Sequence, residues 1–306
     1  MPFRPALVYR IPWLLGLLLY TTAAAGQSRL TVSRPAMGTP WSVTVAAADT
    51  TGAGAAIARA YARVEAVERV ASDYRTDSEI NTLRPGWQRV SPDLHRLVRA
   101  SRRLYRRSGG AFDVTVGHLT RLWRRAFRQQ QFPDPQDVHG ARTQVQGQAL
   151  RAGPFRRVYL PPGSRLDFGG IAKGYGIDAA AEVLRAAGFD RYLIDGGGDL
   201  LLGEPPPGAT GWRVQVPGGT LDTARVAVAT SGSAFRYLEH DGKRYSHIID
   251  PRTGYGITDP RSVTVLAPTA THADGLASAL SVLGEGKRKA LLLRYRGTAR
   301  WGEVNR

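Results

Sequence analysis

The sequence predicts an α+β fold, in which one compact domain of mixed sheets and packed helices follows an N-terminal signal peptide. Strand-like and helix-like segments succeed one another without a regular β-α-β alternation, which argues against a doubly wound parallel sheet. The 306 residues are 42% hydrophobic and 22% charged, an ordinary globular composition, and no convincing internal repeat is present. We therefore expect residues 26–306 to form a single domain.

The first 25 residues differ from the rest of the chain. Arg4 and Arg10 precede or border an almost wholly apolar run at 11–20, and small residues follow at 21–25. A basic start, a short apolar run and an A-x-A-like site are typical of a cleavable signal peptide. The run is shorter than the roughly 20 residues that a spanning helix needs, which favours cleavage over an uncleaved anchor. We expect an exported, periplasmic protein, and the absence of cysteine excludes a lipoprotein anchor.

The chain carries a formal net charge of +17, and the excess is nearly all arginine. Such a basic surface suits nucleic acid, anionic lipid or anionic ligands. No zinc-finger, helix-turn-helix or RNA-recognition signature accompanies the arginines, so we expect no nucleic-acid partner. The remaining interpretations are a solvated basic surface, peripheral association with an anionic membrane surface and attraction to an acidic partner. The absence of cysteine also excludes thiolate catalysis and cysteine metal sites.

The expected elements alternate irregularly along the chain. Residues 30–46 have strand character, 54–70 form an amphipathic helix, and 78–79 begin a helical turn. Ser91 is expected to cap a second helix that starts at Pro92 and ends before Gly109. The Gln/Pro-rich stretch 129–147 is expected to be a surface excursion. Further strands are expected at 157–160, 165–168, 191–195, 212–216, 224–230, 245–249 and 262–266, helices at 175–188 and 272–283, and a final hairpin from 291–293 with Trp301.

Residues 167–178, D-F-G-G-I-A-K-G-Y-G-I-D, contain a strand end, two adjacent glycines and a helix start. Glycine lets ligand oxygens approach the backbone, and a helix N-terminus directs N–H groups towards phosphate. Lys173 could add a positive charge beside a diphosphate. The spacing matches neither the Rossmann fingerprint nor the Walker A loop. By itself, a glycine-rich turn from strand to helix is structural more often than not.

Residues 273–278, A-D-G-L-A-S, place Asp274 and Ser278 four positions apart. On a helix, their oxygens lie on one face and could hold Mg²⁺, which prefers hard oxygen ligands. In the alternative interpretation, Asp274 caps the helix and Ser278 packs as a small residue.

Residues 245–254, Y-S-H-I-I-D-P-R-T-G, place His247 near a strand end as a candidate general base or a structural histidine. Asp113 lies between apolar residues in G-A-F-D-V-T-V-G, where it would need hydrogen bonds. Neither a G-x-S-x-G elbow nor an H-E-x-x-H helix is present, so a conventional hydrolase is unsupported.

The residues of eight such segments, and the order in which the segments occur, resemble the ApbE family of FAD:protein FMN transferases. The resemblance runs through 37–39 (M-G-T), 72–80 (S-D-Y-R-T-D-S-E-I), 110–117, 167–175, 196–199 (G-G-G-D), 229–232 (A-T-S-G), 245–254 and 273–278. It covers essentially everything after the expected signal peptide, and it implies an ApbE-like, T-fold-related domain.

The resemblance implies Mg²⁺-dependent chemistry with FAD as substrate. FMN would pass to a threonine hydroxyl in the acceptor motif of a target flavoprotein, and AMP would be released. The implied metal ligands are Asp274, Ser278 and the backbone carbonyl of Gly170, and the implied catalytic residues are His247 and Asp274. The implied FAD contacts are Met37, Tyr74, Ala111, Phe112, Asp113, Asp167, Lys173, Ser246 and His247.

The sequence departs from the family pattern at four positions. Ser278 stands where threonine is usual, which keeps the ligand oxygen but restrains its rotamer less. Arg84, His118 and Gly256 replace a common asparagine and two common prolines. Two alternative functions remain open at this stage. They are an FAD pyrophosphatase, in which water replaces the threonine hydroxyl, and a periplasmic flavin-binding protein with little turnover.

Overall fold

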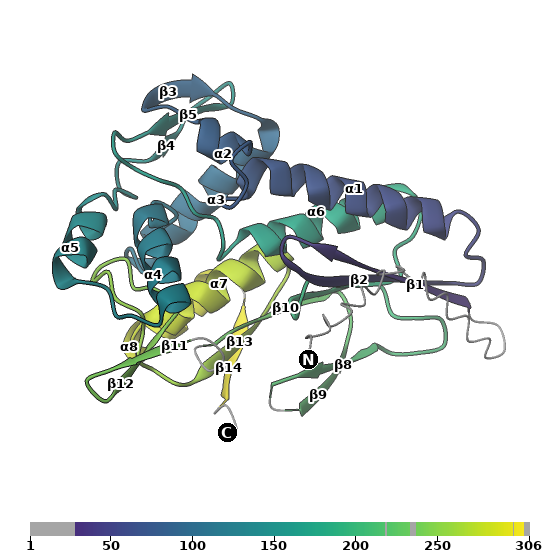
Figure 1. Ribbon diagram of the computed structural model, residues 1–306. Helices are drawn as coiled ribbons and strands as arrows, with labels where there is room; N and C mark the ends of the chain where they lie inside the picture. The colour runs from purple at the N-terminus through teal and green to yellow at the C-terminus, as the bar shows by residue number, and fades with distance from the viewer. Residues whose placement is uncertain (1–27, 218, 233–236, 296, 303–306) are drawn as a thin grey trace, which may run out of the picture.

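A seven-stranded antiparallel sheet forms the centre of the protein in a computed structural model, which describes residues 28–217, 219–232, 237–295 and 297–302 (Figure 1). Its strand order is β1 (Ser28–Ala36), β2 (Thr39–Ala47), β6 (Tyr192–Asp195), β7 (Leu200–Leu202), β10 (Val226–Ser231), β13 (Ser262–Ala267) and β14 (Thr298–Gly302). The expected signal peptide, 1–25, lies outside the described residues. Within them, no helix is long and apolar enough to cross a membrane.

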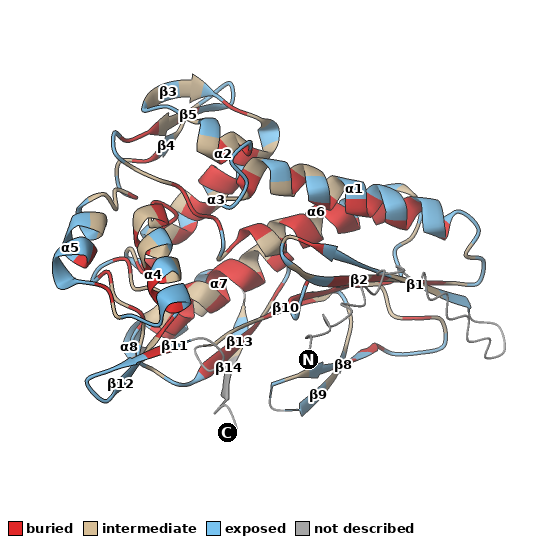
Figure 2. Cartoon of the chain, viewed as in Figure 1, coloured by how far each residue is buried: buried red, intermediate tan, exposed pale blue. Residues whose placement is uncertain are grey.

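Three helices cover one face of this sheet: α1 (Ala53–Ala71), α6 (Ala172–Ala186) and α7 (Ala270–Val282) (Figure 1). Alanines and glycines bring α6 and α7 close together. A Cβ added to Gly174 would lie 2.2 Å from the carbonyl oxygen of Ala270, so only glycine permits this approach. Figure 2 shows the buried faces of the helices turned towards the sheet. This packing holds the first turn of α6 against the first half of α7.

The opposite face of the sheet is partly covered by a hairpin of β8 (Trp212–Val216) and β9 (Gly219–Thr223). Trp212 and Val214 of this hairpin pack against Leu200, Leu202 and Val228 of the sheet in a second hydrophobic cluster. The large sheet is therefore covered by helices on one face and by this small hairpin on the other.

The remaining elements flank the helical layer (Figure 1). A small sheet contains β3 (Gly86–Arg89), β5 (Arg157–Leu160) and β4 (Arg151–Ala152), and it adjoins α2 (Glu79–Thr82) and α3 (Pro92–Ser108). Helix α4 (Gly117–Gln129) packs Trp123 and Phe127 against Leu238 in the hairpin of β11 (Tyr237–His240) and β12 (Lys243–Ser246). Helices α5 (Pro135–Thr143) and α8 (Glu285–Tyr295) complete the domain.

The predicted α+β class is confirmed, and most predicted elements are present within a few residues of their expected ends. Ser91 caps α3 by accepting a hydrogen bond from the Leu94 amide at 3.1 Å, as the sequence predicts. The stretch 129–147 is mostly exposed, as predicted, and contains α5. Three predictions are wrong in part: 165–168 forms only an isolated bridge at Arg165, 245–249 is a strand only as far as Ser246, and 291–293 belongs to helix α8 rather than to a hairpin.

Candidate active site

A cavity of about 1050 Å³ opens between the helical layer and the α4 region. This volume is at the upper end of the roughly 300–1,000 Å³ found for pockets that bind drug-sized ligands, so the cavity can hold a dinucleotide. Every residue that the sequence predicts for the site, except Ser246, lines it: Met37, Tyr74, Ala111, Phe112, Asp113, Asp167, Gly170, Lys173, His247, Asp274 and Ser278. Segments that are far apart in the sequence thus meet around one cavity.

The inner end of the cavity is built from two helices and a buried ion pair. Asp274 is 6% exposed, and its Oδ2 accepts a hydrogen bond from the backbone amide of Gly174 at 3.0 Å. Lys173, one residue earlier in α6, donates to the carboxylate of Asp199, which is 4% exposed. Burial alone would lower the pKa of Lys173, but Asp199 and Asp274 outweigh burial and raise it. Lys173 therefore stays positively charged beside Asp274.

Asp274 lies in the second turn of α7 and does not cap the helix. The cap is Thr269, whose hydroxyl accepts a hydrogen bond from the His272 amide at 3.2 Å. This excludes the alternative in which Asp274 serves as the helix cap. Burial and the nearby Asp199 raise the pKa of Asp274 to about 7. Such a carboxylate gains strongly from a cation that compensates for its lost hydration.

The oxygens around Asp274 fit a hard cation. A Cβ added to Gly170 would lie 2.8 Å from the Ser278 hydroxyl, so the bare Gly170 backbone comes directly against this side chain. A carboxylate, a hydroxyl and a backbone carbonyl are ligand types that Mg²⁺ accepts, with substrate phosphate and water completing the shell. Among the described residues, no cluster of three or more histidine, aspartate and glutamate side chains could hold a metal. A Mg²⁺ site here would thus depend on Ser278, Gly170 and the substrate as well as Asp274.

Asp178 fixes the start of α7 from the neighbouring helix α6. Its carboxylate accepts hydrogen bonds from the amides of Ala270 and Thr271 at 2.8 and 2.9 Å, and a third from the Thr271 hydroxyl at 2.5 Å. These bonds occupy N–H groups that a helix start leaves without intrahelical partners. Asp178 therefore helps to set the position of α7, and with it the position of Asp274.

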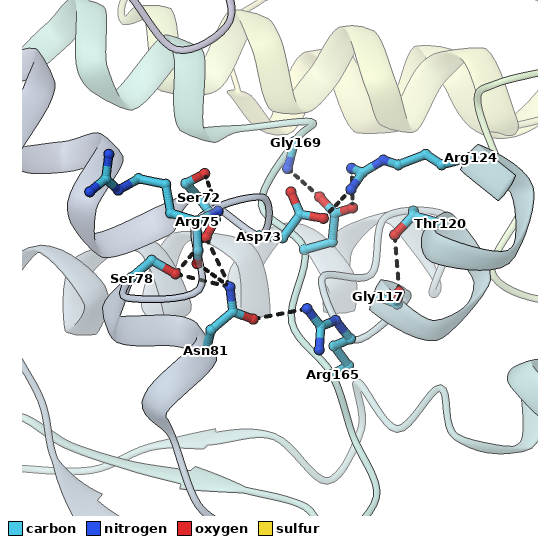
Figure 3. Close-up of polar contacts among 11 residues, drawn as sticks. Ser72, Asp73, Arg75, Ser78, Asn81, Gly117, Thr120, Arg124, Arg165 and Gly169 are labelled. Atoms are coloured by element: carbon cyan, nitrogen blue, oxygen red, sulfur yellow. Dashed lines mark hydrogen bonds and ion pairs between the residues drawn. The ribbon is translucent and has the colours of Figure 1, made fainter. Parts of the chain in front are cut away.

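The outer end of the cavity is organised by Arg124 of α4 (Figure 3). Its guanidinium group donates to Asp73 and, at 2.8 Å, to Oδ2 of Asp167. It also lies 4.3 Å from the centre of the Tyr74 ring, which is 72% exposed. Asp167 in turn accepts a hydrogen bond from the Gly169 amide at 2.7 Å, within the glycine-rich turn. Arg124 thus links three chain segments at the cavity entrance.

Polar contacts tie down the loop that carries Asp73 and Tyr74 (Figure 3). Asn81 donates to the carbonyls of Ser72 and Arg75 at 3.3 and 2.7 Å, and its side-chain oxygen accepts from Arg165 at 3.0 Å. The Ser78 hydroxyl donates to the Ser72 carbonyl at 2.5 Å. The exposed Tyr74 ring is therefore presented by a loop whose backbone is held at several points.

The side walls contain the remaining predicted contacts. Met37 adopts a positive φ of 48° in the turn between β1 and β2, and its sulfur lies 3.0 Å from where a Cβ on Gly176 would be. Asp113 is buried, and its carboxylate accepts from the amides of Thr115 and Gly147 at 2.8 and 3.2 Å. Burial raises the pKa of Asp113, and these bonds oppose the rise. Asp113 thus supports the wall that Ala111 and Phe112 form.

His247 and Ser246 differ in their placement. His247 is exposed on the cavity side of the segment after β12. Ser246 is only 1% exposed, and its hydroxyl accepts a hydrogen bond from the Ile248 amide at 3.0 Å. Ser246 therefore supports the His247 segment from behind instead of lining the cavity.

Comparison with known proteins identifies the family. The ApbE family model matches residues 37–300. The chain belongs to the ApbE family. The FAD:protein FMN transferase of Klebsiella pneumoniae (strain 342) is 35% identical over an alignment 317 positions long, gaps included, which covers 95% of this chain and 89% of that protein. The FAD:protein FMN transferase of Escherichia coli (strain K12) is 32% identical over 284 residues, which cover 84% of this chain and 79% of that protein.

Solved structures agree with the family assignment. The apo form of the flavinyl transferase ApbE from Pseudomonas stutzeri has a TM-score of 0.81 at 29% identity, covering 92% of each chain. The flavin transferase ApbE from Vibrio cholerae has a TM-score of 0.79 at 29% identity, covering 90% of this chain and 93% of that one. The predicted membership of the ApbE family and the predicted ApbE-like fold are confirmed.

Sequence analysis did not assign three residues of this ApbE-family cavity: Asp73, Arg124 and Asp199. Asp73 and Asp199 lie inside segments that carry the family resemblance, S-D-Y-R and G-G-G-D. Arg124 lies in the arginine cluster R-L-W-R-R, which we interpreted only as surface charge. A helical assignment for residues 117–129 would have placed Arg124 near the buried Trp123 and indicated a position at an interior surface.

Proposed function

We propose that this protein is a Mg²⁺-dependent FAD:protein FMN transferase that moves FMN from FAD to a threonine hydroxyl of a target flavoprotein and releases AMP. The observation that carries the proposal is the joining of two complementary surfaces in one cavity. At the inner end, Asp274, Ser278 and Lys173 suit a diphosphate with its cation. At the outer end, Tyr74 and Arg124 offer a flat surface suited to an aromatic ring system.

Attack of a hydroxyl on a diphosphate depends chiefly on charge neutralisation and in-line positioning. Mg²⁺ held by Asp274, Ser278 and the Gly170 carbonyl would neutralise phosphate charge. Lys173 lines the same cavity and could bind a phosphate oxygen, since Asp199 fixes its ammonium group.

His247 is our proposed base for the incoming threonine. The threonine oxygen forms a bond to the phosphorus of the FMN half, and the bond from that phosphorus to the bridging oxygen breaks. The threonine proton passes to His247, and AMP leaves with the bridging oxygen. Because His247 is exposed at the cavity, an acceptor segment of another protein could approach it from solvent.

Water could replace the threonine hydroxyl in the same geometry, and a binding protein would leave FAD intact. One experiment separates the three functions. The purified protein is incubated with FAD, Mg²⁺ and a domain that bears a threonine acceptor motif, with a threonine-to-alanine version of that domain as control. We expect covalent FMN only on the threonine domain, measured by mass spectrometry. Free FMN and AMP with either domain would support hydrolysis, and unchanged FAD would support binding alone.

We also propose that the protein acts outside the cytoplasm on exported or membrane flavoproteins and associates peripherally with the membrane surface. The signal-peptide pattern at 1–25 and the net charge of +17 support these proposals. Fractionation of cells that produce the full chain tests them. We expect the protein in the periplasmic fraction, and we expect salt to release any of it that sediments with membranes. Recovery of the protein with cytoplasmic proteins would contradict export.

A further inference from the structure

A second hollow of about 220 Å³ lies on the far side of α7 from the active-site cavity, between α3, α7 and α8. The two cavities share α7 but no lining residue. Asp274 and Ser278 line the large cavity, whereas His272 and Leu276 line the small one. Its volume is below the roughly 300 Å³ at which pockets for drug-sized ligands begin, so it suits a small group.

Three arginines of α3 surround this hollow: Arg96, Arg99 and Arg103. Spacings of three and four residues place them on one face of the helix. All three side chains are exposed, whereas Leu104, Leu276 and Tyr295 form a buried floor. The His272 ring meets the Tyr295 ring edge to face at 5.1 Å and completes one wall. The result is a concave surface with an apolar floor and a cationic rim.

Within the described part of the chain, no ion pair neutralises the rim arginines, although Tyr175, Asp93 and Glu182 raise the pKa of Arg96. No carboxylate there lies within 4.0 Å of Arg96, Arg99 or Arg103 in an ion pair. Helix α3 contains six arginines and a single acid, Asp93. Asp93 already accepts two hydrogen bonds from Arg63, at 2.7 and 2.5 Å. Asp93 therefore cannot fully neutralise the positive charge of the rim arginines.

Neighbouring groups reinforce this positive field. Thr271 and His272 in the first turn of α7 also line the hollow. Arg107, one further turn along α3, lies 4.7 Å from the centre of the Tyr295 ring. Asp178 accepts hydrogen bonds from the start of α7, and its charge also reaches His272 in the wall of the hollow. Like charges around one small hollow repel one another unless an anion binds between them.

We propose that this hollow binds a phosphoryl group, carried either by a small free phosphate or by the headgroup of an anionic lipid. Guanidinium groups bind phosphate oxygens through paired N–H donors, which suits two or three arginines converging on one group. The apolar floor suits the carbon atoms next to that phosphate. The proposal does not depend on the transferase function, because the active-site cavity contributes no residue to the hollow.

The central test compares two double variants with equal loss of charge. Arg99→Gln with Arg103→Gln removes two rim arginines, whereas Arg106→Gln with Arg128→Gln removes two exposed arginines outside the hollow. Titration calorimetry with inorganic phosphate, in a chloride buffer, measures the affinity. We expect at least about a tenfold loss for the rim variant, since hydrogen bonds to charged groups are lost, and less than about a twofold loss for the control.

Two further measurements identify the source of the phosphate and check the fold. Cosedimentation with phosphatidylcholine vesicles, with and without phosphatidylglycerol, tests the lipid headgroup. If the rim variant, but not the control, loses binding to phosphatidylglycerol vesicles, the hollow binds a lipid headgroup. If the rim variant loses binding to inorganic phosphate but still binds the vesicles, the hollow binds a free phosphate. The rate of AMP release from FAD should stay at the wild-type level in both variants, which shows that they are folded.

Three results would overturn the proposal. The wild-type protein could bind neither inorganic phosphate nor phosphatidylglycerol vesicles. The rim variant could bind both as tightly as the wild type. The control variant could lose as much affinity as the rim variant, which would show a diffuse effect of net charge instead of a site.

Discussion

The two ends of the active-site cavity are built in different ways. The inner end lies on helices α6 and α7, where Asp274 and Asp199 are buried and hydrogen-bonded. The outer end lies on a loop and on α4, where Tyr74 is exposed and stacks on Arg124. A reaction at phosphorus needs charges that do not move when the substrate binds. Recognition of a large ligand and of a partner protein needs access, which an exposed ring on a loop provides.

This comparison predicts a separation of effects between the two ends. Changes at the inner end should lower kcat or the stability of the fold, and changes at the outer end should mainly raise the KM for FAD. Four substitutions test the separation, and we describe them in order of decreasing expected effect.

Asp274→Asn should have the largest effect. The change keeps the size of the side chain but removes the anionic ligand at the proposed Mg²⁺ site, so kcat should fall at least about 100-fold. FAD should still bind, because the outer end is untouched. Release of AMP and fluorescence quenching of FAD measure the two quantities. Wild-type turnover in this variant would contradict the metal assignment.

Lys173→Met should mainly affect stability. It leaves the carboxylate of Asp199 buried without its partner, which should lower the free energy of unfolding by about 3 kcal/mol. The double variant Lys173→Met with Asp199→Asn should recover most of this loss, because residue 199 then carries no charge that needs a partner. Urea unfolding measures both variants. If the double variant is as unstable as the single one, charge pairing does not hold the inner end together.

Arg124→Gln should raise the KM for FAD about tenfold while kcat changes less. The loss of the guanidinium leaves Asp73 and Asp167 facing each other and removes the support of Tyr74. Arg125→Gln is the matched control, because Arg125 lies next to Arg124 on α4 and its ion pair among the described residues is with the exposed Asp137, at 3.3 Å. An equal effect of both substitutions on the KM for FAD would show that Arg124 has no specific role at the outer end of the site.

Tyr74→Leu should have the smallest effect, a rise in the KM for FAD of about two- to fivefold, as expected for loss of an exposed stacking contact. Tyr74→Phe should behave as the wild type, because the ring face is retained. Steady-state kinetics with varied FAD distinguishes the two variants. A large fall in kcat for Tyr74→Leu would show that the two ends of the cavity do not act separately.

Several features of the fold follow directly from local sequence. At the start of α3, Ser91 supplies the N-cap and the ring of Pro92 fixes φ. Short-range chemistry is therefore sufficient to predict where this helix begins. The prediction fails where tertiary packing overrides the local pattern. Residues 291–293 are three leucines that suit a buried strand or a helix equally, and packing in α8 decides between them. The local sequence does not reveal helix α4, because arginines stand between the buried Trp123 and Phe127 and only tertiary packing shows which face is covered.

The same division applies to the site. Spacing along α7 predicts that Asp274 and Ser278 share a face, because the helical repeat is a local property. By itself, the sequence determined the family, the helix that carries these oxygens and the glycine-rich turn. Only the tertiary structure brought Asp73, Arg124 and Asp167 together, across separations of 51 and 43 residues. It also placed Lys173 between Asp199 and Asp274, because the charge of a buried group depends on neighbours that the linear order does not reveal.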